Sequence, residues 1–488
     1  MSLSNLLIAE GAQLRDLAGE VLSSKTIQQT VEALCTMLQA QFPTGAAIAV
    51  SLPNSPAWVI ADLAIQDAGM ISVPIPDFFT APQSVQVFQQ AGVVGLLHRL
   101  GQAHGLASIG TFQPVAQCDA CEITISAAAF SKPKASMRAQ HQKLTFTSGS
   151  TGSPKGIPIT EADQSSVAIT LAEALAPLKI QRHLSMLPLP VLLENIAGVY
   201  TALRSGIDVL VPDLSRVGLL GSSRFDPAPA VDLITEQAVE SMILLPQMLF
   251  ALVAFLSRSK RRLSSLKFVA VGGAHTPTTL IAQARALGIP VYEGYGLSEA
   301  ASVVCLNLPG QDRVGSVGRP LVHRRIKTAE DGELLFSDAA GGAWTATGDL
   351  GSIDAQGFVS IDGRKKNLLI TGYGRNVSPE WPETLLLATG AFAQVMVYGE
   401  GEAHLSALVF PVHAALSEAE ISAAVAAANA QLPDYAQIGD WYRLSQPCSL
   451  ANGLATANGR IRRDLVTQRL LGCALPRHSL IALEEVCA

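Results

Sequence analysis

The sequence is poor in charged and in aromatic side chains. Asp, Glu, Lys and Arg make up 15% of the 488 residues and Phe, Trp and Tyr 5%, whereas hydrophobic residues reach 49%. So hydrophobic a composition excludes an intrinsically disordered chain. The net charge is -6 and the basic clusters are short, which gives no electrostatic reason to expect a nucleic-acid partner.

The sequence also lacks a stretch that is long and apolar enough to span a bilayer. Its most apolar segment, Met242–Leu256, is short and contains Pro246, so we predict a buried strand followed by a helix there. The N-terminus has no basic region before an apolar core, which argues against a signal peptide. Seven scattered cysteines, with Cys118 and Cys121 as an isolated Cys-x-x-Cys pair, indicate no disulfide framework. We therefore expect a cytoplasmic protein without a transmembrane segment.

The length and the hydrophobic pattern predict an α/β protein with several domains. A prior of about 150 residues per domain suggests two to four units. A capped amphipathic helix is expected at Ser24–Gln41, and strand-like runs alternate with helix-length segments further along. This alternation is typical of parallel sheets covered by helices. The strand-like runs are Ala46–Leu52, Ile71–Ile75, Val93–Leu97, His183–Leu187, Asp208–Val211, Ser241–Leu245 and Phe268–Val271.

The stretch Thr145–Gly156 has the composition of a phosphate-binding loop. Its glycines let the backbone approach an anion, its hydroxyl groups add donors, and Lys155 supplies a point charge. It is not a Walker-type loop, because no Gly-Lys-Ser/Thr run closes it. On composition alone, a flexible surface turn remains the alternative. The candidate ligands are Thr147, Ser148, Gly149, Ser150, Thr151, Gly152 and Lys155.

The order of residues in this loop, Ser-Gly-Ser-Thr-Gly-Ser-Pro-Lys-Gly, resembles the signature loop of the adenylate-forming (AMP-binding) enzymes. Tyr292–Glu299, read as Tyr-Glu-Gly-Tyr-Gly-Leu-Ser-Glu, is similar to a second motif of these enzymes. The motif style is closest to long-chain acyl-CoA synthetases. The resemblance implies a large multi-sheet N-terminal domain with parallel sheets, helices and a small β subdomain, residues 1–362, and a small mobile α+β C-terminal domain, residues 363–488.

The resemblance assigns nucleotide-binding roles to the second motif. Tyr295 would stack on adenine, Ser298 would bond the α-phosphate, and Glu299 would hold Mg²⁺ through an oxygen ligand, as hard cations require. Glu293 and Gly294 belong to the same motif. If this motif stood alone, without the phosphate-loop motif upstream, a plain turn around its glycines would be the alternative interpretation.

Four further groups follow from the resemblance. Gly273 and Ala274 would form the wall between the adenine and acyl pockets. Asp349, in Thr-Gly-Asp, would accept both ribose hydroxyls, and Lys366 would be the pivot of the C-terminal domain, where a solvated charged residue suits a hinge. The remaining expected ribose-side positions are Ile361 and Arg364.

One position departs from the family pattern. In Asn452–Arg463, Arg460 stands where the family has a lysine that touches the α-phosphate and the substrate carboxylate. This exchange is not conservative, because a planar guanidinium cannot act as a compact point charge. Arg460 either does the work of the lysine with altered geometry or leaves adenylation weak. A nearby lysine cannot replace it, since none follows Lys366.

The expected reaction has two steps. ATP and a carboxylic acid would give acyl-AMP and pyrophosphate, and a thiol of coenzyme A or of a carrier protein's phosphopantetheine arm would displace AMP. Leu187–Asn195 resembles the stretch before the substrate-gating helix, although Val191 and Leu193 stand where a His or an aromatic is frequent. The stretch lacks the aspartate that holds the ammonium group in amino-acid-activating relatives, which favours a plain fatty or aryl acid. The alternative is a catalytically weakened protein that binds acyl-adenylate or AMP.

Overall fold

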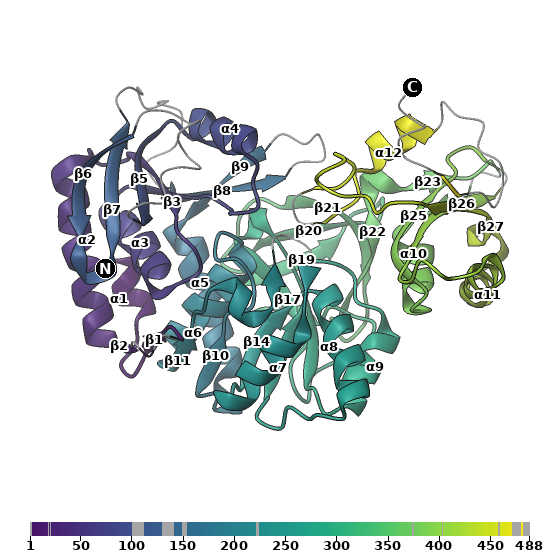
Figure 1. The fold of residues 1–488 in the computed structure, drawn as a ribbon, viewed down its shortest axis with the longest axis horizontal. Helices are drawn as coiled ribbons and strands as arrows, with labels where there is room; N and C mark the ends of the chain where they lie inside the picture. The colour runs from purple at the N-terminus through teal and green to yellow at the C-terminus, as the bar shows by residue number, and fades with distance from the viewer. Residues whose placement is uncertain are drawn as a thin grey trace. The chain divides into compact units, whose positions relative to one another are not determined.

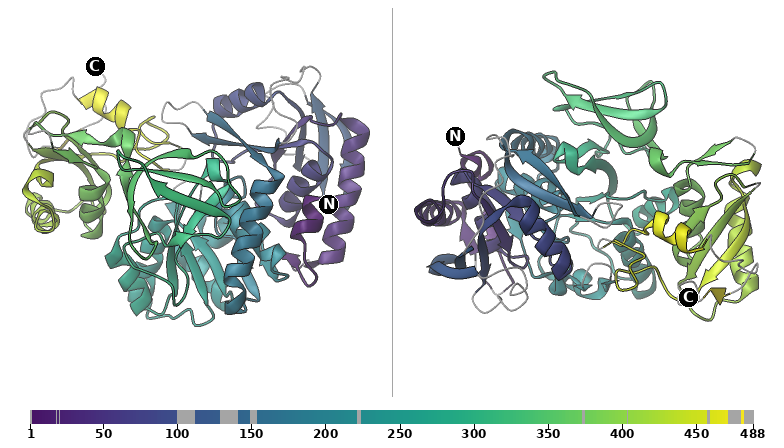
Figure 2. Two further views of the ribbon diagram at one scale, coloured as in Figure 1. Left: turned by 180° about the vertical axis from the view of Figure 1, so that it is seen from behind. Right: turned by 90° about the horizontal axis from the view of Figure 1, so that it is seen from above.

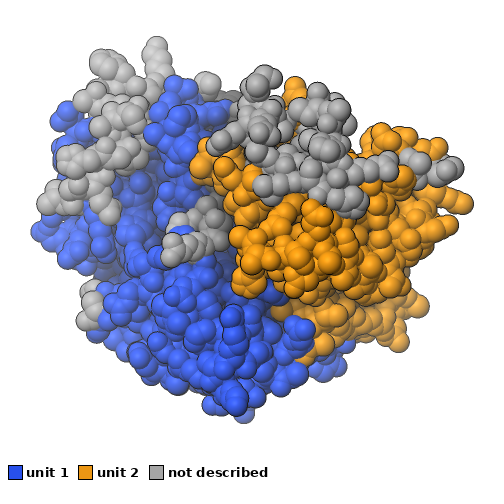
Figure 3. All heavy atoms as spheres, turned by 45° about the vertical axis from the view of Figure 1, so that its right-hand side comes forward, with its two compact units in different colours: residues 1–274, 283–312, 321–323 blue, residues 275–282, 313–320, 324–488 orange. Residues whose placement is uncertain are grey.

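The computed structural model (Figures 1 and 2) describes residues 2–17, 19, 21–99, 112–128, 141–148, 154–220, 224–372, 375–402, 404–456, 459–470 and 480–481. The chain forms two compact units (Figure 3). Unit 1 consists of residues 1–274, 283–312 and 321–323, and unit 2 of residues 275–282, 313–320 and 324–488. The boundary expected after residue 362 stays a prediction.

A mixed sheet occupies the N-terminal part of unit 1. Its strand order is β6-β7-β5-β3-β4-β8-β9, with a parallel centre and an antiparallel pair at each edge. The apolar runs expected to be strands form its centre, as predicted. The strands are β3 (Ala47–Ser51), β4 (Ile71–Pro74), β5 (Val93–Arg99), β6 (Phe112–Cys118), β7 (Ile123–Ala128), β8 (His141–Ser148) and β9 (Pro154–Thr160).

A second sheet completes unit 1. The strands of this sheet that belong to unit 1 follow the order β17-β16-β15-β14-β10-β11-β1-β2, and β14, β15 and β16 run parallel. The segment Met242–Leu256 is a strand followed by a helix, as predicted. The elements are β1 (Gln13–Arg15), β2 (Val21–Ser23), β10 (Arg182–Leu184), β11 (Asp208–Leu210), β14 (Ser241–Leu244), α8 (Pro246–Ser259), β15 (Phe268–Val271), β16 (Val291–Leu297) and β17 (Ser302–Leu306).

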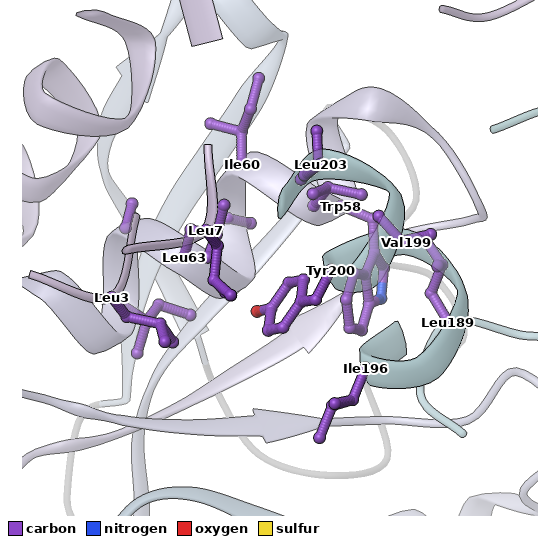
Figure 4. Close-up of a cluster of buried hydrophobic side chains, with 14 of the residues drawn as sticks. Leu3, Leu7, Trp58, Ile60, Leu63, Leu189, Ile196, Val199, Tyr200 and Leu203 are labelled. Carbon is purple, nitrogen blue, oxygen red and sulfur yellow. The ribbon is translucent and has the colours of Figure 1, made fainter. Parts of the chain in front are cut away.

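Helices pack around these sheets in unit 1. The predicted helix is α2 (Ser24–Gln41), and the Ser23 side chain caps it by accepting a hydrogen bond from the Thr26 amide at 3.2 Å. Figure 4 shows part of the main core, where Leu3, Leu7, Trp58, Leu63 and Tyr200 come together from three helices. The other helices of this unit are α1 (Leu3–Leu7), α3 (Pro56–Asp67), α4 (Ala81–Ala91), α5 (Glu161–Leu175), α6 (Thr201–Arg204) and α7 (Pro227–Glu236).

A π-helix, Leu193–Tyr200, was not predicted from the sequence. Strand β10 ends at Leu184 and is shorter than the expected run to Leu187. The reason is visible at Met186 and Leu187, whose amides donate to the Glu194 carboxylate at 3.1 and 2.9 Å instead of continuing a strand ladder. Short π-helical stretches are frequent at functional sites.

In its described residues, unit 2 carries two four-stranded sheets and a short two-stranded one, β23 (Leu369–Ile370) with β24 (Asn376–Val377). The first has the order β19-β20-β21-β22 and the second the order β25-β26-β27-β28. The runs Glu333–Ser337, Gln394–Tyr398 and Leu405–Phe410 are parts of β20, β25 and β26. The elements are β19 (Arg324–Thr328), β20 (Glu333–Asp338), β21 (Thr345–Ile353), β22 (Val359–Arg364), α10 (Glu380–Ala388), β25 (Phe392–Tyr398), β26 (Leu405–Pro411), α11 (Glu418–Asn429), β27 (Ile438–Leu444), α12 (Arg463–Leu470) and β28 (Leu480–Ile481).

Within the described parts of the chain, none of the helices combines the length and the hydropathy needed to cross a membrane.

Candidate active site

The expected phosphate loop lies in the β8–β9 hairpin of unit 1. The two strands are antiparallel, with Thr147 opposite Lys155 and Ser148 opposite Pro154. The Lys155 side chain is exposed. Strand β8 thus leads into the loop, whereas the candidate ligands Gly149, Ser150, Thr151 and Gly152 lie outside the described residues.

The second motif forms the end of β16 and the turn into β17. A bulge separates Tyr295 from Gly296, and a Cβ atom at Gly296 would collide with the carbonyl oxygen of Ser302. This close approach explains why the position is a glycine. Beyond the turn, Ala301 and Ser302 have φ values of 56° and 119°, which are uncommon for residues with a side chain. Such strain is concentrated at functional sites.

The predicted ligands of this motif differ in exposure. Glu299 is exposed, Tyr295 and Ser298 are half-buried, and Glu293 is buried. Ser298 and Glu299 begin a single 3₁₀ turn, Ser298–Ala300. An exposed carboxylate beside a hydroxyl fits an oxygen-coordinated divalent cation, so Glu299 suits Mg²⁺ by chemistry.

The glycine turn after β15 lies next to this motif. A Cβ atom at Gly272 would be 3.0 Å from the Gly294 carbonyl oxygen, so the two predicted segments are in direct contact. Gly273 has a φ of 82°, and a Cβ atom there would lie 3.1 Å from Leu245 Cδ2 and 4.0 Å from Leu193 Cδ2. The turn therefore has two leucine side chains against it. Ala274 is exposed.

The π-helix that carries Leu193 is held by a buried glutamate. The Glu194 side chain is fully buried, accepts the two amides after β10, and lies 3.3 Å from His183 Nε2. A side chain at Gly198 would clash with this carboxylate. Sequence reasoning missed the role of Glu194, although an acidic residue within an apolar run is a signal of a buried, hydrogen-bonded carboxylate.

In unit 2, the predicted ribose ligand Asp349 is a cross-strand partner of Arg364. Arg364 Nε lies 2.8 Å from Asp349 Oδ1, and Arg364 Nη1 donates to the Thr347 carbonyl at 3.2 Å. The Asp349 side chain is 5% exposed and that of Arg364 is 40% exposed. The structure thus brings together the two residues that sequence reasoning assigned to the ribose.

Two other predicted residues lie on the same sheet or at its end. Ile361 is half-buried in β22, opposite Gly351. Lys366 is exposed in a 3₁₀ turn, Lys365–Asn367. The pivot role of Lys366 stays a prediction.

Arg460 closes a tight turn, opposite Thr456. Its amide donates to Thr456 Oγ1 at 3.1 Å, its carbonyl accepts from the Thr456 amide at 2.7 Å, and Ala455 bridges to Ile461. Desolvation and then the like charge of Arg364 lower the pKa of Arg460, while Asp349 raises it. Because the Arg460 side chain is itself exposed, solvent screens these effects and the group remains a cation at neutral pH.

An ion pair anchors the chain just after Arg460. Arg463 pairs with Glu383 of α10, donates to the Val397 carbonyl at 3.0 Å, and the Val397 amide donates to Glu383 at 2.6 Å. Burial raises the pKa of Glu383 to about 7, and the charge of Arg463 opposes this shift. Neither residue was singled out from the sequence.

Comparison with known proteins decides the family. The model of the AMP-binding enzymes matches residues 14–346. The chain belongs to the AMP-binding enzyme family. This confirms the resemblance seen in the motifs, and the matched range covers the β8–β9 hairpin, the Tyr292–Glu299 motif and strands β19 and β20.

Individual members of the AMP-binding family are similar over parts of their length. A medium/long-chain-fatty-acid–CoA ligase of Mycobacterium tuberculosis is 32% identical over 320 residues, which is 58% of this chain and 53% of the relative. A 2-succinylbenzoate–CoA ligase of Bacillus subtilis is 28% identical over 283 residues, 52% of this chain and 55% of the relative. The chain thus spans about half of the length of these curated relatives.

The fold of the AMP-binding enzymes extends over nearly the whole chain. The crystal structure of an anthranilate CoA ligase in complex with anthranoyl-AMP matches with a TM-score of 0.79 at 18% identity and covers 97% of this chain and 98% of that chain. The α/β fold class predicted from the sequence is confirmed.

Proposed function

We propose that this protein is an ATP-dependent acid–thiol ligase. It activates a carboxylic acid without an α-amino group as acyl-AMP and transfers the acyl group to the thiol of coenzyme A or of a phosphopantetheine arm. The observation that carries this proposal is the Asp349–Arg364 pair, a buried carboxylate held by a half-exposed arginine at the position expected to receive a ribose. The CoA ligases among the similar proteins support the same reaction class.

The residues of unit 1 suit the phosphates and the metal. In this proposal the β8–β9 hairpin and Lys155 bind the terminal phosphates, Ser298 donates to the α-phosphate, and Glu299 holds Mg²⁺. When bound, the cation neutralises phosphate charge. Tyr295, next to the bulge that Gly296 allows, offers its ring to the adenine.

The acid is proposed to be apolar next to its carboxylate. Leu193 and Leu245 are the side chains that approach Gly273 from the side expected for the acyl group. An ammonium group placed among leucines would lose its hydration without gaining a counter-charge. This arrangement favours fatty or aryl acids over amino acids.

The chemistry uses charge more than proton transfer. A carboxylate oxygen attacks the α-phosphorus, the new O–P bond forms as the bond to pyrophosphate breaks, and pyrophosphate leaves with the electron pair. In the second step the thiolate sulfur attacks the acyl carbon and AMP leaves. Arg460 and Ser298 are proposed to stabilise the charge that develops around the α-phosphate, as fixed donors and cations do in such transfers. Lys366 is proposed as the hinge between the steps.

A second candidate is an acyl-adenylate or AMP-binding protein with weak turnover. The observation that favours it is Arg460, a fork-shaped cation whose pKa is lowered by desolvation and by the like charge of Arg364. In this case the Asp349–Arg364 ion pair would still bind the ribose of AMP.

Acid-dependent exchange between ATP and pyrophosphate tests both candidates. We expect exchange with at least one member of a panel of fatty and aryl acids, and none with amino acids. If the wild type gives no exchange while Arg460→Lys does, the ligase proposal fails and the weakened binder is correct. Parallel assays with coenzyme A and with a phosphopantetheinylated carrier protein would identify the thiol acceptor.

A further inference from the structure

A fully buried polar cluster joins β8 to the π-helix in unit 1. Lys143, on β8 and four residues before Thr147, has no exposed side-chain surface, and its Nζ lies 2.7 Å from Asp62 Oδ2. Lys143 also donates to Asn195 Oδ1, and its Nζ lies 5.1 Å from the centre of the Tyr200 ring. Asn195 and Tyr200 both belong to the π-helix.

Asp62, on α3, is the centre of this cluster. Besides Lys143 it accepts hydrogen bonds from Ser72 Oγ at 2.5 Å, from Asn195 Nδ2 at 3.4 Å and from the Tyr200 hydroxyl. A second layer continues the network, because Gln66 Nε2 donates to the Tyr200 hydroxyl at 3.3 Å and Gln164 Nε2 donates to Gln66 at 2.7 Å. The charged pair is therefore surrounded by donors and acceptors and needs no solvent.

The cluster connects two parts of the site that bind different substrates. Strand β8 leads directly into the phosphate hairpin. The π-helix begins at Leu193, whose side chain approaches Gly273 in the wall of the expected acyl pocket. A buried ion pair is weak evidence for stability, since well-packed apolar residues often stabilise as much, and the best-attested use of such pairs is to specify one arrangement.

We propose that Lys143 and Asp62 are positioning residues that fix the π-helix against β8, so that the phosphate hairpin and the acyl wall are set in one arrangement. Lys143 acts through its hydrogen bond to Asn195, which an apolar side chain could not make. The inference rests on the proposed function in one respect, namely that the hairpin after β8 binds the phosphates of ATP.

The test compares three variants. Lys143→Met removes the donor but leaves the Asp62 carboxylate buried without its cation. Lys143→Met/Asp62→Asn removes both charges, and Leu34→Ala, at a fully buried position of α2, is the control for a loss of core packing alone. The melting temperature, the affinity for MgATP measured calorimetrically without acid, and KM for the acid are recorded for each.

We expect Lys143→Met to bind MgATP at least tenfold more weakly and to raise KM for the acid. The double variant should regain part of the lost melting temperature, because no unpaired charge remains, yet keep the weak MgATP binding and the raised KM. Leu34→Ala should lose melting temperature and keep wild-type affinity. If Lys143→Met does not fold, the double variant alone decides.

Wild-type affinity in the double variant would overturn the inference, as would an affinity loss that simply follows the melting temperature in all three variants. A wild type that binds MgATP without acid-dependent exchange refutes only the proposed function. A wild type that binds no MgATP refutes both.

Discussion

Two ion pairs of this protein differ in solvent exposure. Lys143 and Asp62 of unit 1 are both 0% exposed, whereas the side chains of Arg364 and Asp349 of unit 2 are 40% and 5% exposed. The first pair has its hydrogen bonds completed by Ser72, Asn195 and Tyr200. The second presents a guanidinium to solvent, where a ligand can reach it.

The difference separates a positioning pair from a binding pair. A buried charge without its partner is costly. Removing either member of the first pair should therefore destabilise the protein and should affect ligand binding only indirectly, through the position of the π-helix. In the second pair the Arg364 guanidinium is exposed and can be hydrated without its partner, so removing the Asp349 charge should act mainly on the ligand. The same substitution should therefore cost much more folding stability at Asp62 than at Asp349.

The largest effect is expected at Asp62. Asp62→Asn leaves the Lys143 cation buried without a counter-charge and should destabilise the protein by about 3–5 kcal/mol. Thermal unfolding followed by calorimetry and by circular dichroism measures the loss. A melting temperature equal to that of the wild type would show that Lys143 is neutral and that the comparison is wrong.

A third pair, Glu383–Arg463, should make the stability of the protein depend on pH. Because burial raises the pKa of Glu383 to about 7, the folded state holds this proton at a pH where the unfolded state has lost it. The stability contributed by the protonated form is present below pH ~4.3 and is lost as the pH rises towards 7, on the order of 3 kcal/mol.

Glu383→Gln, which imitates the protonated acid, is the reference for this effect. The wild type should lose stability relative to Glu383→Gln between pH 5 and pH 8, as measured by thermal unfolding at each pH. A constant difference over this range would mean that Arg463 keeps Glu383 ionised throughout.

The next effect is expected at Asp349. Asp349→Asn should weaken MgATP binding by about 1.5–3 kcal/mol, the range for hydrogen bonds to a charged group, while unfolding changes by about 1 kcal/mol or less. Isothermal titration calorimetry and thermal unfolding on the same preparation check both parts. A variant that unfolds early but binds normally would reverse the assignment of the two pairs.

The smallest effect is expected at Arg460. Both arginine and lysine keep a full charge at neutral pH, so Arg460→Lys should change acid-dependent pyrophosphate exchange by no more than about tenfold, or 1.4 kcal/mol. Arg460→Ala, which removes the charge, is the matched control and should lose more than that. Equal rates in all three proteins would exclude Arg460 from the reaction.

Much of the fold was predictable because its elements are locally patterned. The helix at Ser24–Gln41 has its apolar face within its own residues and its cap at Ser23, directly before it, and Phe268–Val271 is a strand with the predicted bounds. The run His183–Leu187 was predicted too long, since Glu194 takes the amides of Met186 and Leu187. The π-helix was missed because no residue pattern distinguishes it from an α-helix.

The candidate site was predictable where its residues form continuous motifs. Gly294, Tyr295, Ser298 and Glu299 lie within one short segment, and their order carries the resemblance to the AMP-binding enzymes. The contact between Gly272 and Gly294 was not predictable, since it depends on which strands are neighbours. The roles of Arg463 and Glu383, 80 residues apart in the chain, were hidden for the same reason.

The sequence by itself determined the family, the α/β class and the candidate ligands of the nucleotide, because these follow from composition, local periodicity and ordered motifs. Only the tertiary structure decided the partners of the buried charges. In the sequence, Lys143 is only a polar residue before a loop. In the folded chain it contacts Asp62, 81 residues away, and Asn195, 52 residues away. Desolvation makes such contacts strong, and desolvation exists only after distant segments have packed together.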